Sequence, residues 1–476
     1  MTNASRKCVV IHNGSCSTVA GFSNMELPKC IIPSSYVKRN NDEKRIFGTF
    51  EMLDETEKNE STSNVYTLID GRGYPYNWED LEAQWRYIYE EHLKVSPAEL
   101  PLVISVPASN GDTDMKIMEK FFDLAFNKLK VPILQILIEP LAIALSMGKS
   151  SALVVDIGAR GCNVTPIVDG TVVKSGVMKS KFGGDFLDYQ ITNSEFFNKE
   201  YDATNLSSCE MWFSSNTWLQ QFKSTMLQVS DKNYSELERY YELQRQQQQQ
   251  QQQAFPNFAL NPLTQKKNFL FKKSKTVTLE LRDSYKLAES LFEPKDALKA
   301  QGESQVQSHS QPHLQQPASN IGLSELMSKS IRKAGAGVSS TGTLGGGGTG
   351  ASLTLNEKGS QHNTNASSNS QLTNGVANPA TSGITSEQVY SLLLTNVIIT
   401  GATSLIAGME QRIINDLSIR FPQYKLTTYA NQIMMDRKVQ SWIAMNSMSN
   451  LPNWELGKWY TKQDFDLLKQ SQSHKN

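Results

Sequence analysis

The chain has no excess of either charge and no uninterrupted apolar run long enough to span a membrane. Its 476 residues carry 47 Lys and Arg against 47 Asp and Glu, so the formal net charge is zero. Direct nucleic-acid binding usually needs a strongly basic surface, so we expect no sequence-specific binding of this kind. The most hydrophobic stretch, residues 131–148, contains Gln135, Glu139 and Pro140. It therefore predicts a buried helix and no membrane span.

Cysteine is also scarce. The spacing of the cysteines matches no metal or redox motif, which favours reduced thiols in the cytosol or nucleus. The first residues lack the apolar core of a signal peptide. The five cysteines are Cys8, Cys16, Cys30, Cys162 and Cys209.

What the chain does contain is a pair of similar hairpin patterns. In residues 152–170, an apolar run reaches Asp156, passes through a turn with Gly158 and Gly161, and leaves along a second β-branched run. Such glycine turns can direct backbone N–H groups at an anion, usually phosphate, and a carboxylate at the mouth suits hydrated Mg²⁺. Taken alone, the pattern is better explained as an ordinary hairpin.

A second copy changes this balance. Residues 8–22 again run through an apolar strand into a glycine turn, Asn13-Gly14-Ser15, and out along another strand. Two such hairpins, about one domain apart, are what a fold with duplicated halves and a nucleotide between them requires.

Four further stretches carry a specific resemblance. They are residues 77–85 (NWEDLEAQW), 95–99 (VSPAE), 396–408 (NVIITGATSLIAG) and 459–466 (WYTKQDFD). With these motifs the chain resembles the actin family. Residues 181–187 (KFGGDFL) and 391–396 (SLLLTN) are similar to the nuclear actin-related branch found in chromatin-remodelling complexes.

The resemblance implies an α/β, actin-like fold of two similar halves around a nucleotide cleft, as in the clan of actins, heat-shock chaperones and sugar kinases. We expect the first half in residues 1–150 and the second in 151–476, with a C-terminal segment that returns to the first half. Polar composition predicts disordered low-complexity inserts at about 244–266, 295–319 and 335–385. The polar stretch between Ser34 and Val65 does not match the loop by which filament-forming actins grip the next subunit. We interpret this as lost self-assembly; drift of the loop sequence is the alternative.

The resemblance also places a degenerate nucleotide site. Of the polar groups that handle metal and phosphate in actins, Asp156 is kept, while the others fall at His12, Glu139, Ala159 and Val19. The implied nucleotide-binding residues are Asn13, Gly14, Ser15, Asp156, Gly158, Arg160, Gly183, Gly401 and Ala402.

These changes predict a weak site. Fewer carboxylates hold Mg²⁺ less tightly, and an arginine at position 160 adds a positive charge beside the phosphates. We therefore expect weak ATP binding, no tightly held Mg²⁺ and no useful hydrolysis, because lost parts of a phosphate clamp cost orders of magnitude in rate. Glu139 could position water; the alternative is a structural salt bridge, for example to Arg160.

The function that follows is a non-catalytic nuclear subunit of SWI/SNF- and RSC-type remodelling complexes. The resemblance implies a heterodimer with a second actin-related protein, both holding a helix of the remodeller ATPase, beside other subunits of the complex. Trp442, Trp454 and Trp459 are candidate partner contacts, with the domain core as the alternative for Trp442 and Trp459. The alternative function is an ATPase of the actin and chaperone clan that uses Asp156 and Glu139.

Overall fold

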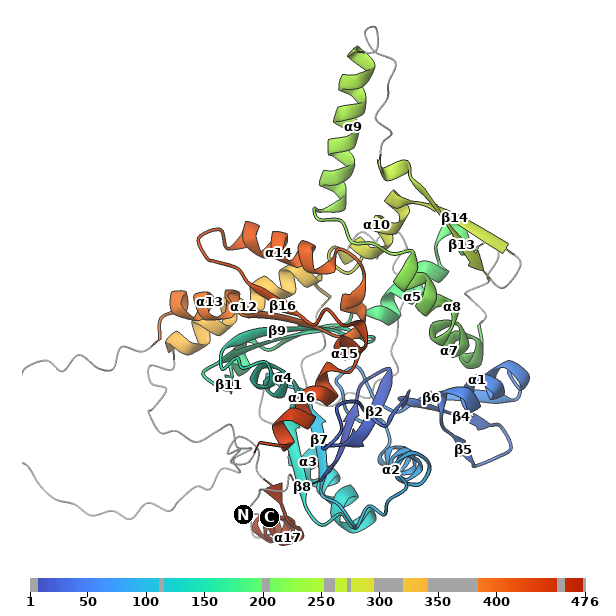
Figure 1. The fold of residues 1–476 in the computed structure, drawn as a ribbon, viewed down its shortest axis with the longest axis vertical. Coiled ribbons are helices and arrows are strands. Elements are labelled where there is room, and N and C mark those ends of the chain that lie inside the picture. Colours follow the sequence, from blue (N-terminus) through green and yellow to red (C-terminus); the bar gives the residue numbers. More distant parts are fainter. Residues whose placement is uncertain are drawn as a thin grey trace, which may run out of the picture.

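The computed structural model describes residues 7–110, 115–198, 206–251, 262–271, 275–294, 320–340, 384–451 and 459–473. In this part of the chain, two large mixed sheets form two α/β halves (Figure 1). The first sheet has the strand order β17 (Trp459–Tyr460), β8 (Leu134–Ile138), β7 (Leu102–Val106), β1 (Val9–Asn13), β2 (Ser17–Phe22) and β3 (Cys30–Pro33).

The second sheet repeats this plan. Its order is β11 (Thr171–Val172), β10 (Cys162–Val168), β9 (Ala152–Ile157), β15 (Val397–Thr400) and β16 (Thr428–Ala430), with β12 (Met178–Ser180) also paired to β10. In each sheet an antiparallel hairpin, β1–β2 or β9–β10, is followed by two parallel strands. The central strands are β-branched and almost entirely buried, as expected for strands covered on both faces. The two-halved α/β fold expected from the sequence is confirmed.

Helices cover the faces of both sheets. In the first half they are α2 (Trp78–Tyr87), α3 (Met115–Phe122) and α4 (Glu139–Ser146), and α2 and α3 continue as π-helical turns at Ile88–Leu93 and Asp123–Lys128. In the second half α12 (Leu323–Ser340), α13 (Ser386–Leu394) and α14 (Met409–Arg420) pack on the sheet. A separate group of helices lies beside it (Figure 1): α5 (Gly184–Thr192), α6 (Glu195–Asn198), α7 (Ser208–Asn216), α8 (Trp218–Thr225) and α10 (Leu281–Glu289). Asn77 caps the start of α2, since its side chain accepts a hydrogen bond from the Glu79 N–H at 2.8 Å.

Two helices join the halves. α4 packs against α16 (Gln440–Ser449), which follows the short α15 (Met434–Lys438), and both lie between the two sheets (Figure 1). Trp442 of α16 is fully buried in the core shared by the two sheets and donates from Nε1 to the Val10 carbonyl at 3.1 Å. Gly21 makes room for this indole, because a Cβ at that position would lie 2.8 Å from the Trp442 ring.

The C-terminal segment packs on the first half. β17 pairs antiparallel with β8, and α17 (Lys462–Ser473) follows it. Phe465 of α17 is buried against Phe122 and Phe126, with ring centroids 5.6 and 6.3 Å apart. The two halves are therefore not contiguous in sequence.

The polar stretch after Ser34 is folded. It forms a three-stranded sheet of β5 (Arg45–Ile46), β4 (Ser35–Arg39) and β6 (Ser63–Thr67), together with the helix α1 (Thr49–Lys58). Arg39 binds both carboxylate oxygens of Glu55 at 2.7 Å, and Ser63 donates to the same carboxylate. This ion pair, partly shielded from water, explains how a helix with few apolar residues is fixed in place.

Two of the expected insert boundaries are wrong. The glutamine run does not begin a disordered segment at 244, because α9 (Tyr234–Gln251) extends through most of it and projects from the body (Figure 1). The hairpin β13 (Lys266–Phe271) and β14 (Lys275–Glu280) follows. Likewise α12 continues to Ser340, past the expected boundary at 335. Gly335 lies against the Tyr390 ring, where a Cβ would come within 2.5 Å of the ring. Residues 295–319 and 341–383 lie outside the described residues.

Candidate functional site

A cavity of about 300 Å³ lies between the two halves. Its walls are the β1–β2 turn, the β9–β10 turn, the start of α5, one face of α8, the loop after β15, and α15. The site residues expected from the sequence line it, except Gly183. This volume is at the lower end of the range for pockets that bind small molecules.

The two hairpin turns face this cavity with part of their hydrogen-bonding capacity already used. The Gly14 N–H bonds the Ser17 carbonyl at 3.0 Å, and the Gly158 N–H bonds the Gly161 carbonyl at 2.9 Å. These two amides therefore close their own turns and are not directed at a ligand.

The loop after β15 requires a glycine at position 401. Gly401 has φ +88°, and a Cβ there would lie 2.5 Å from Asp156 Oδ1. Any side chain would both strain the backbone and collide with the carboxylate. Ala402, the next residue, begins the short 3₁₀ turn Ala402–Leu405 that closes the cavity on this side.

Gly183 lies behind the β9–β10 turn. A Cβ at Gly183 would come within 2.6 Å of the carbonyl oxygens of Gly158 and Ala159. The next two amides hold the same carbonyls, with Gly184 N–H to Gly158 at 3.0 Å and Asp185 N–H to Ala159 at 2.8 Å. The start of α5 thus fixes the turn, and Gly184 is the glycine that lines the cavity.

The side chain of Asn13 is engaged in the first half. Its amide donates to Thr18 Oγ1 at 2.9 Å, and its oxygen accepts from Trp85 Nε1 at 3.0 Å. A ligand would therefore meet the backbone at Asn13–Ser15 and not this amide.

The Glu139 carboxylate contacts two side chains of the protein, Ser441 and His12. It accepts a hydrogen bond from Ser441 Oγ at 2.5 Å and lies 3.6 Å from His12 Nε2. His12 in turn contacts Ser105 Oγ through Nδ1 at 2.8 Å. The suggested salt bridge from Glu139 to Arg160 is wrong, because the pairing partner at this site is His12.

Asp156 is the second acid of the site. Burial, and then the nearby Glu139 carboxylate, raise the pKa of Asp156 to about 7, against the opposing effects of Asn163 and Lys179. Asn163 donates to Asp156 Oδ2 at 3.3 Å. Burial lowers the pKa of Lys179, whereas the surrounding carboxylates raise it. A carboxyl group that is partly protonated near neutral pH is a poor ligand for a divalent cation.

Arg160 reaches across the cleft to the first half. Its two terminal nitrogens donate to the Ile69 carbonyl at 2.6 Å and to Thr67 Oγ1 at 2.9 Å, and Nε lies 3.7 Å from Asp185. The guanidinium lines the cavity. Its two terminal nitrogens nevertheless donate to other groups of the protein. The sequence could not show these contacts.

Helix α7 makes further contacts across the same opening. Cys209 Sγ donates to the Ser63 carbonyl at 3.1 Å, and Trp212 Nε1 donates to Ser35 Oγ at 2.9 Å. Ser208 Oγ accepts from the Val65 N–H at 3.0 Å. We call these contacts, with those of Arg160, the cross-cleft latch. The latch holds the outer ends of the two halves together through the chain's own groups.

Sequence reasoning missed several cavity residues. Lys223 of α8 pairs with Asp188 at 2.7 Å, and Arg437 of α15 donates to the carbonyls of Asn431 and Ser404. Met434 and Lys438 also line the cavity. No sequence motif marked these residues as part of a site.

The donor set fits a nucleotide better than a metal ion. Among the described residues, no group of three or more His, Cys, Asp or Glu side chains is arranged to hold a metal. Four acids line the cavity: Asp156, with its raised pKa, Glu139, which is paired with His12, Asp185, which lies 3.7 Å from Arg160, and Asp70, which binds Arg72 at 2.8 Å. These residues do not fit a tightly held Mg²⁺. The cavity could hold a nucleotide against its backbone turns, with Lys223 and Lys438 among its lining cations.

The three candidate partner tryptophans differ in position. Trp442 is fully buried, so its prediction as a partner contact does not fit this structure, and the alternative of a core residue holds. Trp459 is half-buried and pairs with Gln135 in the first sheet. Trp454 lies outside the described residues. No helix in the described ranges is long and apolar enough to cross a membrane.

Comparison with known proteins agrees with this architecture. The family model "Actin" matches residues 3–341 and 354–471. Actin-related protein 7 of Saccharomyces cerevisiae is 53% identical over 488 residues, which cover 98% of this chain and 96% of that protein. Actin-related protein 4 of Schizosaccharomyces pombe is 24% identical over 466 residues, 96% of this chain and 94% of that protein. The Schizosaccharomyces pombe protein named SWI/SNF and RSC complexes subunit arp42 is 31% identical over 192 residues, 40% of this chain and 43% of that protein. Given the family match over nearly the whole length and the duplicated fold around a cleft, the chain belongs to the actin family.

Proposed function

We propose that the chain is a nuclear, non-catalytic actin-fold subunit of ATP-dependent chromatin-remodelling complexes of the SWI/SNF and RSC type. The observation that carries the proposal is the state of the cleft. Glu139 is bound to Ser441 and lies beside His12, and Arg160 is bound to the opposite half. Side chains at the positions that would bind phosphate and metal therefore bind other groups of the protein instead.

The relatives support the same role. One protein similar to part of the chain is named as a subunit of SWI/SNF and RSC complexes. A relative similar over almost the whole chain is an actin-related protein. We infer that the chain pairs with a second actin-related protein and that both hold a helix of the remodeller ATPase. Trp454 and the half-buried Trp459 stay candidates for an aromatic anchor in this contact.

The assembly role can be separated from cleft chemistry. A tagged chain with Asp156→Asn and Glu139→Gln should recover the remodeller ATPase from nuclear extract at the wild-type level, with remodelling rates within about twofold. Thermal unfolding of the purified variant controls for misfolding. Loss of remodelling in a variant that still assembles would contradict the non-catalytic role. A Trp454→Ala variant that retains both partners at the wild-type level would remove that residue from the interface.

We expect weak binding of ATP with little dependence on Mg²⁺. The phosphate turns keep their glycines, but Val19 offers no cation where the resemblance implies a lysine, and Arg160 is engaged elsewhere. Calorimetry of ATP binding with Mg²⁺ and with a chelator tests this. Tight binding that disappears on chelation would refute it.

An ATPase is the second candidate function, and one observation favours it. Asp156, with a pKa raised to about 7, and Glu139 line one cavity, and a carboxylate with a pKa near neutral can act as a base. Phosphate release from the pure chain that is lost with Glu139→Ala, and kept with Glu236→Ala on the exposed face of α9, would establish this function. We expect no release above background from either variant or from the wild type.

A further inference from the structure

One edge of the small sheet in the first half is covered by the second half. The strand order β5–β4–β6 leaves β6 (Ser63–Thr67) at an edge of this sheet. Helix α7 of the second half packs against β6 and α1 (Figure 1). An edge strand presents a series of backbone groups that have no partner strand, and such groups need other hydrogen-bond partners once they are covered.

The alternation along β6 decides which of its groups face α7. At one end, the Thr62 carbonyl accepts from the Asn40 N–H at 2.8 Å. At the other end, the Leu68 N–H donates to the Ser34 carbonyl at 2.9 Å. The even-numbered residues of this segment therefore bond toward β4. In an antiparallel pair, the backbone groups of the odd-numbered residues then point away from the partner strand.

Helix α7 binds two of these outward positions. The Ser63 carbonyl accepts from Cys209 Sγ at 3.1 Å. The Val65 N–H donates to Ser208 Oγ at 3.0 Å. The first turn of α7 thus takes the place that a neighbouring strand would have in a wider sheet.

Arg160 binds the next two outward positions from a different element, the β9–β10 turn. It donates to Thr67 Oγ1 at 2.9 Å and to the Ile69 carbonyl at 2.6 Å. The second half therefore binds every odd-numbered residue from 63 to 69. A movement that opens the cleft breaks all of these hydrogen bonds together and exposes the edge of β6 to water.

Each of these hydrogen bonds is ordinary when considered alone, because domains that touch usually form some polar contacts. That explanation does not account for their order. Two elements that are far apart in the sequence bind consecutive outward positions of one strand. This arrangement fixes both the distance and the register between the outer ends of the two halves.

We propose that the cross-cleft latch keeps the two halves closed in the absence of nucleotide, so that nucleotide binding does not switch the shape of the chain. In many hinged proteins a ligand closes the cleft by bridging its two sides. A ligand shifts such an equilibrium only by its differential affinity for the open and closed forms. Where groups of the chain already close the cleft, little open form is left for a ligand to shift.

The test measures how fast Cys209 reacts with N-ethylmaleimide in the full-length chain, freed of nucleotide with apyrase. Mass spectrometry of the labelled peptides gives the rate at each cysteine. Cys209 is fully buried at the latch, so it reacts only when the latch opens. Cys8 is buried in the core shared by the two sheets and reports global unfolding.

We expect slow labelling of Cys209 in the nucleotide-free wild type, changed less than about twofold by ATP. Arg160→Ala should accelerate it at least about tenfold, because a hydrogen bond to a charged group contributes that factor or more to an equilibrium. Thr67→Val, which keeps a β-branched side chain in the strand, should accelerate it by a smaller factor. In both variants Cys209 should still react faster than Cys8.

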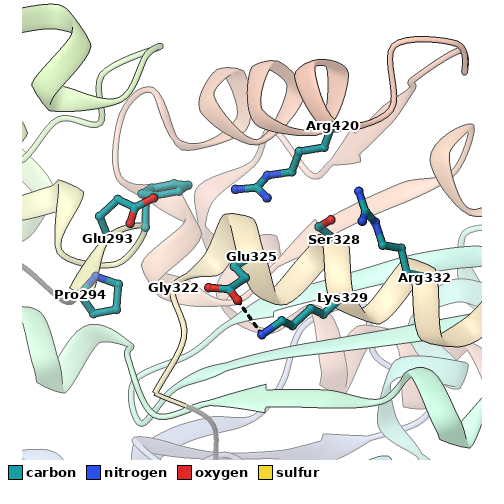
Figure 2. A pocket seen from close by; sticks show the side chains of 9 residues that line it. Glu293, Pro294, Gly322, Glu325, Ser328, Lys329, Arg332 and Arg420 are labelled. Atoms are coloured by element: carbon teal, nitrogen blue, oxygen red, sulfur yellow. Dashed lines mark ion pairs between the residues drawn. The ribbon is translucent and has the colours of Figure 1, made fainter.

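The matched control is Lys329→Ala on α12. This change removes the 2.6 Å ion pair with Glu325, in a cavity of the second half that shares no lining residue with the cleft (Figure 2). Its Cys209 rate should stay within about twofold of the wild type. Circular dichroism of each variant checks that it folds.

Three results would overturn the proposal. Fast labelling of Cys209 without nucleotide that ATP slows at least about tenfold would mean that nucleotide closes the cleft. Unchanged Cys209 rates in both latch variants would mean that these hydrogen bonds do not keep it closed. Equal rates at Cys209 and Cys8 in both variants would mean that the latch opens only on global unfolding. Because the isolated chain is used, none of these results bears on the proposed assembly.

Discussion

Replacement of Arg160 by alanine tests whether this residue closes the cleft or binds phosphate. The guanidinium donates to the Ile69 carbonyl at 2.6 Å and to Thr67 Oγ1 at 2.9 Å. Hydrogen bonds to charged groups contribute about 1.5–3 kcal/mol each. The side chain is 25% exposed, so water replaces part of what is lost. We therefore expect the Arg160→Ala variant to lose about 2–3 kcal/mol of unfolding free energy.

Urea unfolding followed by tryptophan fluorescence measures this loss as a lower midpoint of the transition. Arg160→Lys should recover only part of it, because lysine cannot bridge two acceptors with a planar fork. Arg239→Ala, on the exposed face of α9, is the control and should leave the midpoint unchanged. The reasoning is refuted if Arg160→Ala leaves the midpoint unchanged and instead weakens ATP binding, because Arg160 would then be a phosphate ligand.

Three further outcomes follow from buried groups. Trp442→Ala should destabilise the chain by about 3–5 kcal/mol in urea, because it removes a fully buried indole between the two sheets; a small effect would place this tryptophan outside the core. Arg412→Met should cost about 3–5 kcal/mol, since it leaves Glu289, bound at 2.7 Å by both guanidinium ends, as an unpaired buried charge; unchanged stability would mean that this carboxylate is neutral. The folded-state pKa of Asp156, about 7, exceeds its ordinary value of 3.8, so the folded chain binds the extra proton and loses stability as pH rises from about 4 to about 7. Asp156→Asn should remove that component of the pH profile, and identical profiles would contradict it.

Local pattern was sufficient for the main strands and helices. The β-branched runs at Val9–Asn13, Ala152–Ile157 and Val397–Thr400 form the centres of the two sheets, because such runs are stable only when both faces are covered. α1 was missed because its stability comes from Glu55 and Arg39, an ion pair with a partner outside the helix. α9 was misjudged at its end, where the glutamine run continues a helix that begins at Tyr234.

The sequence predicted the backbone turns of the candidate site, but it did not predict the contacts of its side chains. Glycine turns are local features, and Gly14, Gly158 and Gly401 all line the cavity. The direction of a long side chain depends on what lies opposite. Arg160 binds the other half, and Glu139 pairs with His12 from a distant strand. No sequence pattern encodes such contacts, because their partners are brought together only by the fold.

The sequence by itself determined the duplicated α/β plan and the two hairpin turns, since each is a property of short stretches, whereas the loss of acids around the cleft stays a prediction from the resemblance. Only the tertiary structure decided what the remaining charged groups do. The outer ends of the halves are joined by the cross-cleft latch, and Trp442 is placed in the core and not at a surface. The physical reason is that burial and charge pairing depend on distances between residues far apart in the chain, which are fixed only when the two sheets pack around α4 and α16.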